Sequence, residues 1–339
     1  MKKGAVDNEY HQPVLIKSLI EKLPPVNGLW IDCTFGAGGY SKALLEAGAD
    51  RIVAIDRDPS VIFHARELGA KYGSKLDFCE ANFSSLMDIV VKFKIKKISG
   101  IVFDVGVSSM QIDEANRGFS FQQDGPLDMR MSQKGITAAD IVNNALEEEL
   151  ANVIFYYGED RQARMIARAI VKERSHRKIL TTEHLSDIIK SVVKPSKSNV
   201  KKTLNPATRT FQALRIAVNN ELEELNTGLI SAEQILEEGA LLAVVSFHSL
   251  EDRLVKQFIK SRSKRSSGKS RYLPADFKFH PTFRELFNKV VKPNVDEISK
   301  NSRARSAKLR IAERLNSRPS HEGVSKIQFP RVKFSTGLR

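Results

Sequence analysis

A glycine-rich turn after the first apolar segment is the strongest chemical signal in the chain. The apolar residues 29–33 are followed by TFGAGG at 34–39, and an amphipathic helical pattern begins directly afterwards. Glycines in such a turn let the backbone approach a ligand at the positive end of the next helix. A glycine turn without any ligand is also common in proteins, so this turn alone does not establish a binding site.

An acidic residue ends the second apolar segment. Asp56 follows RIVAI at 51–55, and an acid at the tip of the second strand of a βαβ unit suits the hydroxyls of a ribose. The glycines are spaced Gly36-x-Gly38-Gly39 rather than G-x-G-x-x-G, and Asp32 precedes them. A carboxylate there would repel a pyrophosphate but suits the ammonium end of S-adenosylmethionine. The pattern therefore favours a methyl donor over NAD.

A third acid, Asp104, follows the apolar segment 98–103 and precedes VGVSS. At this strand tip in a doubly wound sheet, a carboxylate lies between cofactor and substrate. It is positioned to contact the donor or to accept a hydrogen bond from a substrate amine, and we take it as the candidate catalytic residue. The alternative is a capping Asp in a serine-rich turn.

Two absences narrow the chemistry. Methylation at carbon 5 of a pyrimidine needs a cysteine nucleophile near this loop, and neither Cys33 nor Cys79 is placed there. No set of clustered acids and histidines stands out as metal ligands, so no metal site is predicted. Two cysteines are also too few for a disulfide framework or a structural zinc site.

Two further segments carry candidate substrate-binding residues. In TRTFQALR at 208–215, Arg209 and Gln212 are able to face a nucleotide, while the apolar residues look like core. In SFHSLEDR at 246–253, His248 and Ser249 stand at the end of an expected strand. A histidine with a purely structural role is an equal alternative at that position.

The order of apolar and amphipathic segments predicts an α/β fold with a doubly wound, mostly parallel Rossmann-like sheet. Strands are expected at 29–33, 51–55, 76–79, 98–103 and 240–247, with an edge strand at 307–314. Helical patterns at 138–157, 161–172 and 182–193 have no strand between them and predict an inserted small helical domain at 132–205 for substrate recognition. A discontinuous methyltransferase domain, 1–131 and 206–318, and a flexible tail, 319–339, complete the prediction.

The positive charge of the chain is concentrated near its end. The net charge is +14, and residues 256–339 hold 22 Lys and Arg against 6 acids. Such a field, with Arg303 and Arg305 as candidate contacts, attracts a polyanion. The interleaved Phe277, Phe279 and Phe283 favour single-stranded nucleic acid over a membrane surface. An ordinary solvated surface is the alternative for part of this charge.

No targeting signal is evident. No apolar run approaches the roughly 18 residues of a membrane span, and the first residues, MKKGAVDNEYHQPV, resemble neither a secretory signal nor an import helix. We therefore expect a cytoplasmic protein without a membrane partner. A homodimer is one allowed state, and the sequence does not decide its oligomeric state.

Taken together, the motifs resemble those of the bacterial small-subunit rRNA (cytosine-N4)-methyltransferases, the RsmH/MraW family. The resemblance runs from HQPV at 11–14 to SAKLR at 306–310, through TFGAGGYS, AIDRDP, DVGVSSMQID, PLDMRM and SFHSLEDR. It implies an S-adenosylmethionine-dependent enzyme that methylates the N4 amine of a cytidine in the decoding region of 16S rRNA. The implied partner is that rRNA within the ribosomal subunit.

By position, the resemblance implies a set of donor-binding residues drawn from several strand ends: Gly38, Gly39, Tyr40, Asp56, Phe83, Asp104 and Gln111. The chain departs from the family pattern at three places. Tyr40 stands where His is usual, Met110 where Pro is common, and Ser302 where Pro is usual. Tyr40 keeps a ring and a hydrogen-bonding tip.

Two other functions compete with this one. A binding protein that remodels rRNA without chemistry would have no need to keep the glycine turn, Asp56 and Asp104. An NAD-linked oxidoreductase disagrees with the glycine spacing and leaves the C-terminal charge unexplained.

Overall fold

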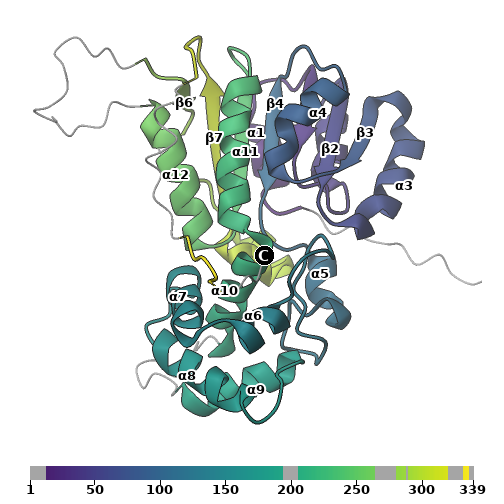
Figure 1. Ribbon diagram of the computed structural model, residues 1–339. Helices are drawn as coiled ribbons and strands as arrows, with labels where there is room; N and C mark the ends of the chain where they lie inside the picture. The colour runs from purple at the N-terminus through teal and green to yellow at the C-terminus, as the bar shows by residue number, and fades with distance from the viewer. Residues whose placement is uncertain (1–12, 194–204, 264–279, 288, 320–330, 336–339) are drawn as a thin grey trace, which may run out of the picture. The chain divides into compact units, whose positions relative to one another are not determined.

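The chain folds into two compact units. The computed structural model describes residues 13–193, 205–263, 280–287, 289–319 and 331–335 (Figure 1). The first unit comprises Met1–Gly106 and Glu224–Ile327, and the second comprises Val107–Glu223 and Gln328–Arg339. The second unit is wider than the predicted insertion at 132–205, since the loop after residue 106 and the helix after residue 206 both belong to it.

A seven-stranded sheet forms the centre of the first unit. Its strand order is β3-β2-β1-β4-β5-β7-β6, and all neighbours are parallel except the pairs that involve β7. The strands are β1 (Leu29–Asp32), β2 (Arg51–Asp56), β3 (Leu76–Glu80), β4 (Gly100–Asp104), β5 (Leu241–Ser246), β6 (Phe283–Glu285) and β7 (Lys308–Arg314). This confirms the predicted α/β class with a mostly parallel, doubly wound sheet.

Apolar strand residues are buried because helices cover the sheet. Every residue of β5 is buried, and α12 packs on β5, β6 and β7 while α2 packs on β1 and β2. A Cβ at Gly228 of α11 would lie 2.8 Å from Phe83 Cβ, so this close approach requires glycine. The helices are α1 (Ile16–Lys22), α2 (Gly39–Glu46), α3 (Ile62–Tyr72), α4 (Leu86–Lys92), α11 (Glu221–Ile235), α12 (Ser249–Ser263) and α13 (Val295–Lys300), with 3₁₀ turns η1 (Pro59–Val61), η2 (Gly73–Lys75), η3 (Phe83–Ser85) and η5 (Ser302–Ser306).

Two expectations for the C-terminal part of this unit are wrong. β7 is not an edge strand, because the three-residue β6 pairs with its outer side. Phe283 of β6 is fully buried, and its ring centroid lies 5.9 Å from that of Phe258, so it cannot stack on a nucleic-acid base. Phe277 and Phe279 lie outside the described residues.

The second unit is helical. It contains α5 (Ser109–Asp113), η4 (Ala115–Arg117), α6 (Ala138–Asn144), α7 (Glu147–Gly158), α8 (Ala163–Arg174), α9 (Thr182–Val192) and α10 (Ala207–Asn219). α7 packs on α8 and α10, and α8 packs on α9 (Figure 1). The predicted helix at 138–157 is two helices, because Leu146 is extended and its N–H donates to Glu149 Oε2 at 2.9 Å. No described helix is both long and apolar enough for a membrane span.

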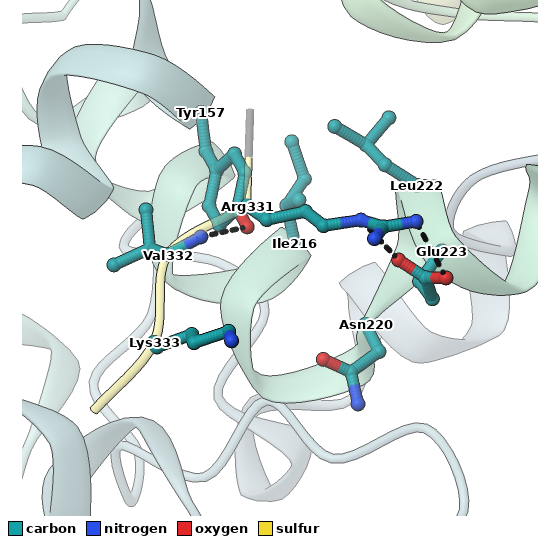
Figure 2. A pocket seen from close by; sticks show the side chains of 8 residues that line it. All are labelled: Tyr157, Ile216, Asn220, Leu222, Glu223, Arg331, Val332 and Lys333. Carbon is teal, nitrogen blue, oxygen red and sulfur yellow. Dashed lines mark hydrogen bonds and ion pairs between the residues drawn. The ribbon is translucent and has the colours of Figure 1, made fainter. Parts of the chain in front are cut away.

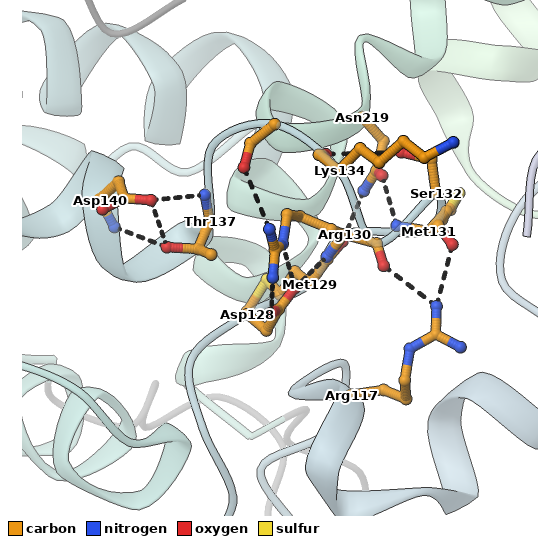
Figure 3. Close-up of polar contacts among 11 residues, drawn as sticks. Arg117, Asp128, Met129, Arg130, Met131, Ser132, Lys134, Thr137, Asp140 and Asn219 are labelled. Atoms are coloured by element: carbon orange, nitrogen blue, oxygen red, sulfur yellow. Dashed lines mark hydrogen bonds and ion pairs between the residues drawn. The ribbon is translucent and has the colours of Figure 1, made fainter.

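The long loop that leads to α6 is fixed by buried hydrogen bonds (Figure 3). The Asn219 amide donates to Met129 O at 2.7 Å and accepts from Met131 N at 2.8 Å. Arg117 donates to the carbonyls of Arg130 and Met131, both at 3.0 Å. Met129 holds a φ of 63°, which is unfavourable for a residue with a Cβ. These side chains therefore hold the loop in a shape that its backbone alone would not favour.

Replacing Asn219 by Ala should destabilise the second unit. Asn219 is 2% exposed, and its loss leaves the Met131 N–H and the Met129 carbonyl without their partner. We expect the free energy of unfolding to fall by about 2 kcal/mol in urea denaturation. Asn144→Ala is the matched control, because Asn144 is exposed and, among the described residues, its amide donates only to Asp140 O. Equal effects of the two substitutions would contradict this role for Asn219.

Candidate functional site

The glycine turn connects β1 to α2 and is shaped by close packing. Gly38 holds a φ of +79°, and a Cβ there would lie 2.9 Å from ring atoms of Phe35. A Cβ at Gly39 would lie 2.1 Å from Pro13 Cγ. Both positions therefore exclude side chains, and the turn keeps the backbone N–H groups at the start of α2 close to the sheet.

Asp56 ties the tip of β2 to this turn. One carboxylate oxygen accepts from Gly36 N at 2.8 Å, and the other accepts from Asp58 N at 2.9 Å. Burial raises the pKa of Asp56 to about 6, and these two backbone hydrogen bonds offset only part of that effect. Each oxygen of an ionised carboxylate keeps a further acceptor position, which suits a pair of ribose hydroxyls.

Asp32 is fully buried at the end of β1. Its carboxylate accepts from the Ser41 hydroxyl at 2.7 Å and from Thr34 N at 3.1 Å. Burial raises its pKa to about 6 against these hydrogen bonds. Each oxygen accepts one hydrogen bond, as in Asp56, but Asp32 is 0% exposed, so it fixes the turn to α2 and acts on a ligand through its charge.

Asp104 has a free carboxylate oxygen at the tip of β4. Its backbone N–H donates to the Thr34 hydroxyl at 2.6 Å, which joins this strand end to the glycine turn. Oδ1 is buried and has no hydrogen-bond partner among the described residues. Burial raises the pKa of Asp104 well above its usual range, and the charges of Asp32 and Glu251 add to that effect. A buried unsatisfied carboxylate oxygen is typical of a ligand-binding position.

These three carboxyl groups fit a cationic ligand. Asp32 pairs with Val102 of β4 and with Ala54 of β2, so Asp56 and Asp104 end the two strands that flank β1. The carboxyl edge of a parallel sheet is where such folds bind ligands. S-adenosylmethionine carries a sulfonium and an ammonium against one carboxylate, and its net positive charge would favour the ionised form of these acids. The residues present therefore fit this methyl donor.

Comparison with known proteins agrees with this chemistry. A family model described as the MraW methylase family matches residues 8–315. The chain belongs to the MraW methylase family. This confirms the resemblance that the sequence motifs indicated.

Relatives of the chain match it over most of its length. It is 48% identical over 323 residues to ribosomal RNA small subunit methyltransferase H of Bradyrhizobium diazoefficiens. The matched region covers 95% of this chain and 96% of that protein. It is 50% identical over 308 residues to the protein of the same name from Methylobacterium nodulans, with 90% of each chain covered. The match to Ruegeria sp. is 46% over 326 residues, with 95% and 96% covered.

Tyr40 stands where the resemblance predicted a histidine, and its hydroxyl donates to Val14 O. The side chain is 3% exposed. The Tyr40 hydroxyl thus anchors the segment before α1. The part of Tyr40 that is left to contact a donor is its backbone. Phe83 is half-buried, and its ring lies edge-on to Phe103 at 5.2 Å between centroids. It offers an apolar surface beside β4.

Gln111 has a structural role in the second unit. Its backbone N–H donates to the Ser108 hydroxyl, and its side chain accepts from Ser108 N, both at 3.1 Å. This reciprocal capping box starts α5. Its contact with a donor stays a prediction, since nothing in the second unit alone tests it.

His248 caps α12. Its Nδ1 accepts from Glu251 N at 3.3 Å, and its Nε2 lies 3.0 Å from Glu251 Oε1. The Glu251 carboxylate also accepts from Phe247 N at 2.8 Å. The Nδ1 contact gives His248 a capping role, but its buried Nε2 makes no hydrogen bond among the described residues. Ser249 begins the same helix. A substrate contact of either residue stays a prediction.

The basic residues of the C-terminal part differ in their exposure. Arg303 and Arg305 are exposed on η5. In contrast, Lys308 and Arg310 both pair with Asp252, at 2.7 and 2.9 Å. Arg262 is 2% exposed and pairs with Glu233 at 2.6 Å. Part of the C-terminal positive charge therefore stabilises the fold.

In the second unit, Arg209 and Gln212 reach the end of α7. Arg209 donates to Glu159 O at 3.3 Å, and Gln212 donates to Tyr157 O at 3.1 Å. Arg209 remains exposed, so it is the better candidate of the two for a phosphate contact. The sequence did not predict Thr34 or Glu251 as site residues. The place of Thr34 at the start of the glycine turn and the place of Glu251 three residues after His248 could have indicated them.

Proposed function

We propose that this protein transfers a methyl group from S-adenosylmethionine to the N4 amine of a cytidine in the decoding region of small-subunit rRNA. The observation that carries the proposal is the buried, unpartnered Oδ1 of Asp104 at the tip of β4, one strand away from the glycine turn. Membership of the MraW methylase family and relatives named ribosomal RNA small subunit methyltransferase H support it.

The chemical difficulty of this reaction lies in the amine. The N4 lone pair is delocalised into the cytosine ring, so the enzyme must hold the nitrogen in line and favour its pyramidal form. S-adenosylmethionine supplies the methyl group when bound. Asp104 Oδ1 accepts an N–H hydrogen bond from the amine, which stabilises the positive charge that develops on the nitrogen. The same carboxylate is placed to take the proton that the methylated nitrogen loses.

Other residues position this carboxylate and the donor. Thr34 holds the Asp104 backbone through its hydroxyl. Gly38, Gly39 and the Tyr40 backbone form the turn that faces the donor, Asp56 binds the ribose hydroxyls, and Phe83 contributes an apolar surface. Gln111 of α5 stays a donor-binding candidate on the ground of the family resemblance alone.

The rRNA substrate is held by exposed cations and by the second unit. Arg303, Arg305 and Arg209 contact phosphates, and His248, Ser249 and Gln212 are the remaining candidates from the sequence. An unpaired segment of RNA allows the target base to be splayed out of its stack. The reaction takes place in the cytoplasm, within the ribosomal subunit. The homodimer that the sequence allows has no support here and is not part of the proposal.

The proposed reaction is tested with radiolabelled donor. The purified protein is incubated with tritiated S-adenosylmethionine and small ribosomal subunits from cells that lack the modification, and the RNA is digested to nucleosides. We expect the label in N4-methylcytidine. Label in another nucleoside would contradict the amine assignment, and absence of label with the donor still bound would favour an rRNA-remodelling protein without chemistry.

Asp104→Asn should lower turnover strongly. The amide removes the negative charge that stabilises the amine, so we expect kcat at saturating donor to fall by about a hundredfold or more. Asp77→Asn is the matched control, because Asp77 ends no donor-side strand and pairs with Arg51 at the half-exposed edge. Normal donor binding with near-wild-type turnover in Asp104→Asn would contradict the assigned role.

A further inference from the structure

Residues 331–335 lie against the helices of the second unit (Figure 2). The Arg331 guanidinium forms two contacts with the Glu223 carboxylate, Nε to Oε2 at 2.9 Å and Nη2 to Oε1 at 3.1 Å. Such a two-pronged pair has a defined geometry that a single ion contact lacks. The first residue of the segment is therefore fixed to the start of α11.

The backbone of the segment is also recognised. Val332 N donates to the Tyr157 hydroxyl at 3.0 Å. The Ser335 N–H and hydroxyl both donate to Glu149 Oε1, at 2.5 and 2.6 Å. Burial raises the pKa of Glu149, but hydrogen bonds from Ser335 and Leu146 outweigh it and lower the pKa overall. The carboxylate thus joins the segment to the break between α6 and α7.

A cavity of about 360 Å³ lies where the segment meets the helices. Ile216, Leu222 and Tyr157 contribute apolar surface, and Asn220 and Lys333 contribute polar groups. Lys333 is exposed, and its ammonium group forms no ion pair among the described residues. Figure 2 shows the Lys333 side chain extending from the segment in the direction of Asn220.

The role of this segment does not follow from the family. The family model ends at residue 315, and the sequence itself predicts only a flexible tail at 319–339. The contacts instead involve three side chains from two elements, Glu149 and Tyr157 of α7 and Glu223 of α11. We define these three side chains as the tail groove.

We propose that residues 331–335 are a docking segment for the tail groove, and that docking presents Lys333 to a phosphate of the substrate rRNA. This rests on the proposed function. Without the segment, the Glu149 and Glu223 carboxylates would lose these partners, and their negative charge would repel a polyanion that approached this surface. With the segment docked, Arg331 neutralises Glu223, Glu149 is hydrogen-bonded, and Lys333 adds a positive charge at the same surface.

Each contact is weak by itself because the groove is partly exposed. The segment is part of the same chain, so its local concentration is high and a few weak contacts are enough to hold it. Because the contacts lie at residues 331, 332 and 335, Lys333 is held between fixed positions. Lys333 therefore loses less conformational freedom on binding RNA than a lysine on an untethered tail would lose.

Docking is tested by hydrogen exchange on the full-length protein. The amides of Val332 and Ser335 should exchange slowly in the wild type. Arg331→Glu and Glu223→Arg should each speed this exchange about fivefold or more, and the double variant, which restores the pair with reversed charges, should recover protection. Wild-type amides that exchange as fast as those of an unfolded peptide would overturn the docking. So would the lack of recovery in a folded double variant.

The role toward RNA is tested by binding rather than by methylation. Lys333→Gln and Arg331→Glu should each weaken binding to small-subunit rRNA about threefold or more, and Lys333→Gln should lower the salt slope by about one. Lys75→Gln on η2, also an exposed lysine, is the matched control. Unchanged affinity and slope in Lys333→Gln would overturn the phosphate contact. Since no chemistry is needed, failure of the methylation assay is distinguishable from failure of this proposal.

Discussion

The burial of three carboxyl groups at the carboxyl edge of one sheet is the constraint on which the site depends. Asp32, Asp56 and Asp104 end the adjacent strands β1, β2 and β4, and burial is the largest cause of the raised pKa of each. Burying like charges side by side is unfavourable unless a cation or protons compensate. A cationic methyl donor provides that compensation. Donor binding therefore relieves the unfavourable electrostatic energy of the buried acids in the ligand-free protein.

The three acids have different hydrogen bonds and therefore different roles in the site. Asp32 accepts one hydrogen bond on each oxygen, from Thr34 and Ser41, and is 0% exposed. Asp56 accepts one on each oxygen, from Gly36 and Asp58, but is only partly buried. Asp104 alone keeps an oxygen without a partner among the described residues. Thr34 connects Asp32 to Asp104, because its N–H donates to the Asp32 carboxylate and its hydroxyl accepts from Asp104 N. The turn and the candidate catalytic carboxylate are thus positioned together.

The sequence predicted the sheet and the strand-tip acids well because both depend on local patterns. Apolar runs ended by Asp56 and Asp104 mark strand ends, and strand ends of a parallel sheet share one edge. It failed where the outcome depends on distant partners. Phe283 is buried by Phe258, and Arg262 is paired with Glu233, neither of which a charge or aromatic count reveals. Likewise, Leu146 breaks a helix because Glu149 caps it, and the tail contacts Glu149 and Glu223 nearly two hundred and about one hundred residues away.

Proton release on donor binding tests the central claim most directly. At pH 6 the raised pKa values of Asp32 and Asp56, each about 6, leave these two acids partly protonated, so a cationic ligand that lowers them must expel protons. Calorimetry of S-adenosylmethionine binding in two buffers with different ionisation enthalpies measures this number. We predict release of about half a proton or more per donor at pH 6, falling as the pH rises to 8. Binding at pH 6 without proton release would contradict the account.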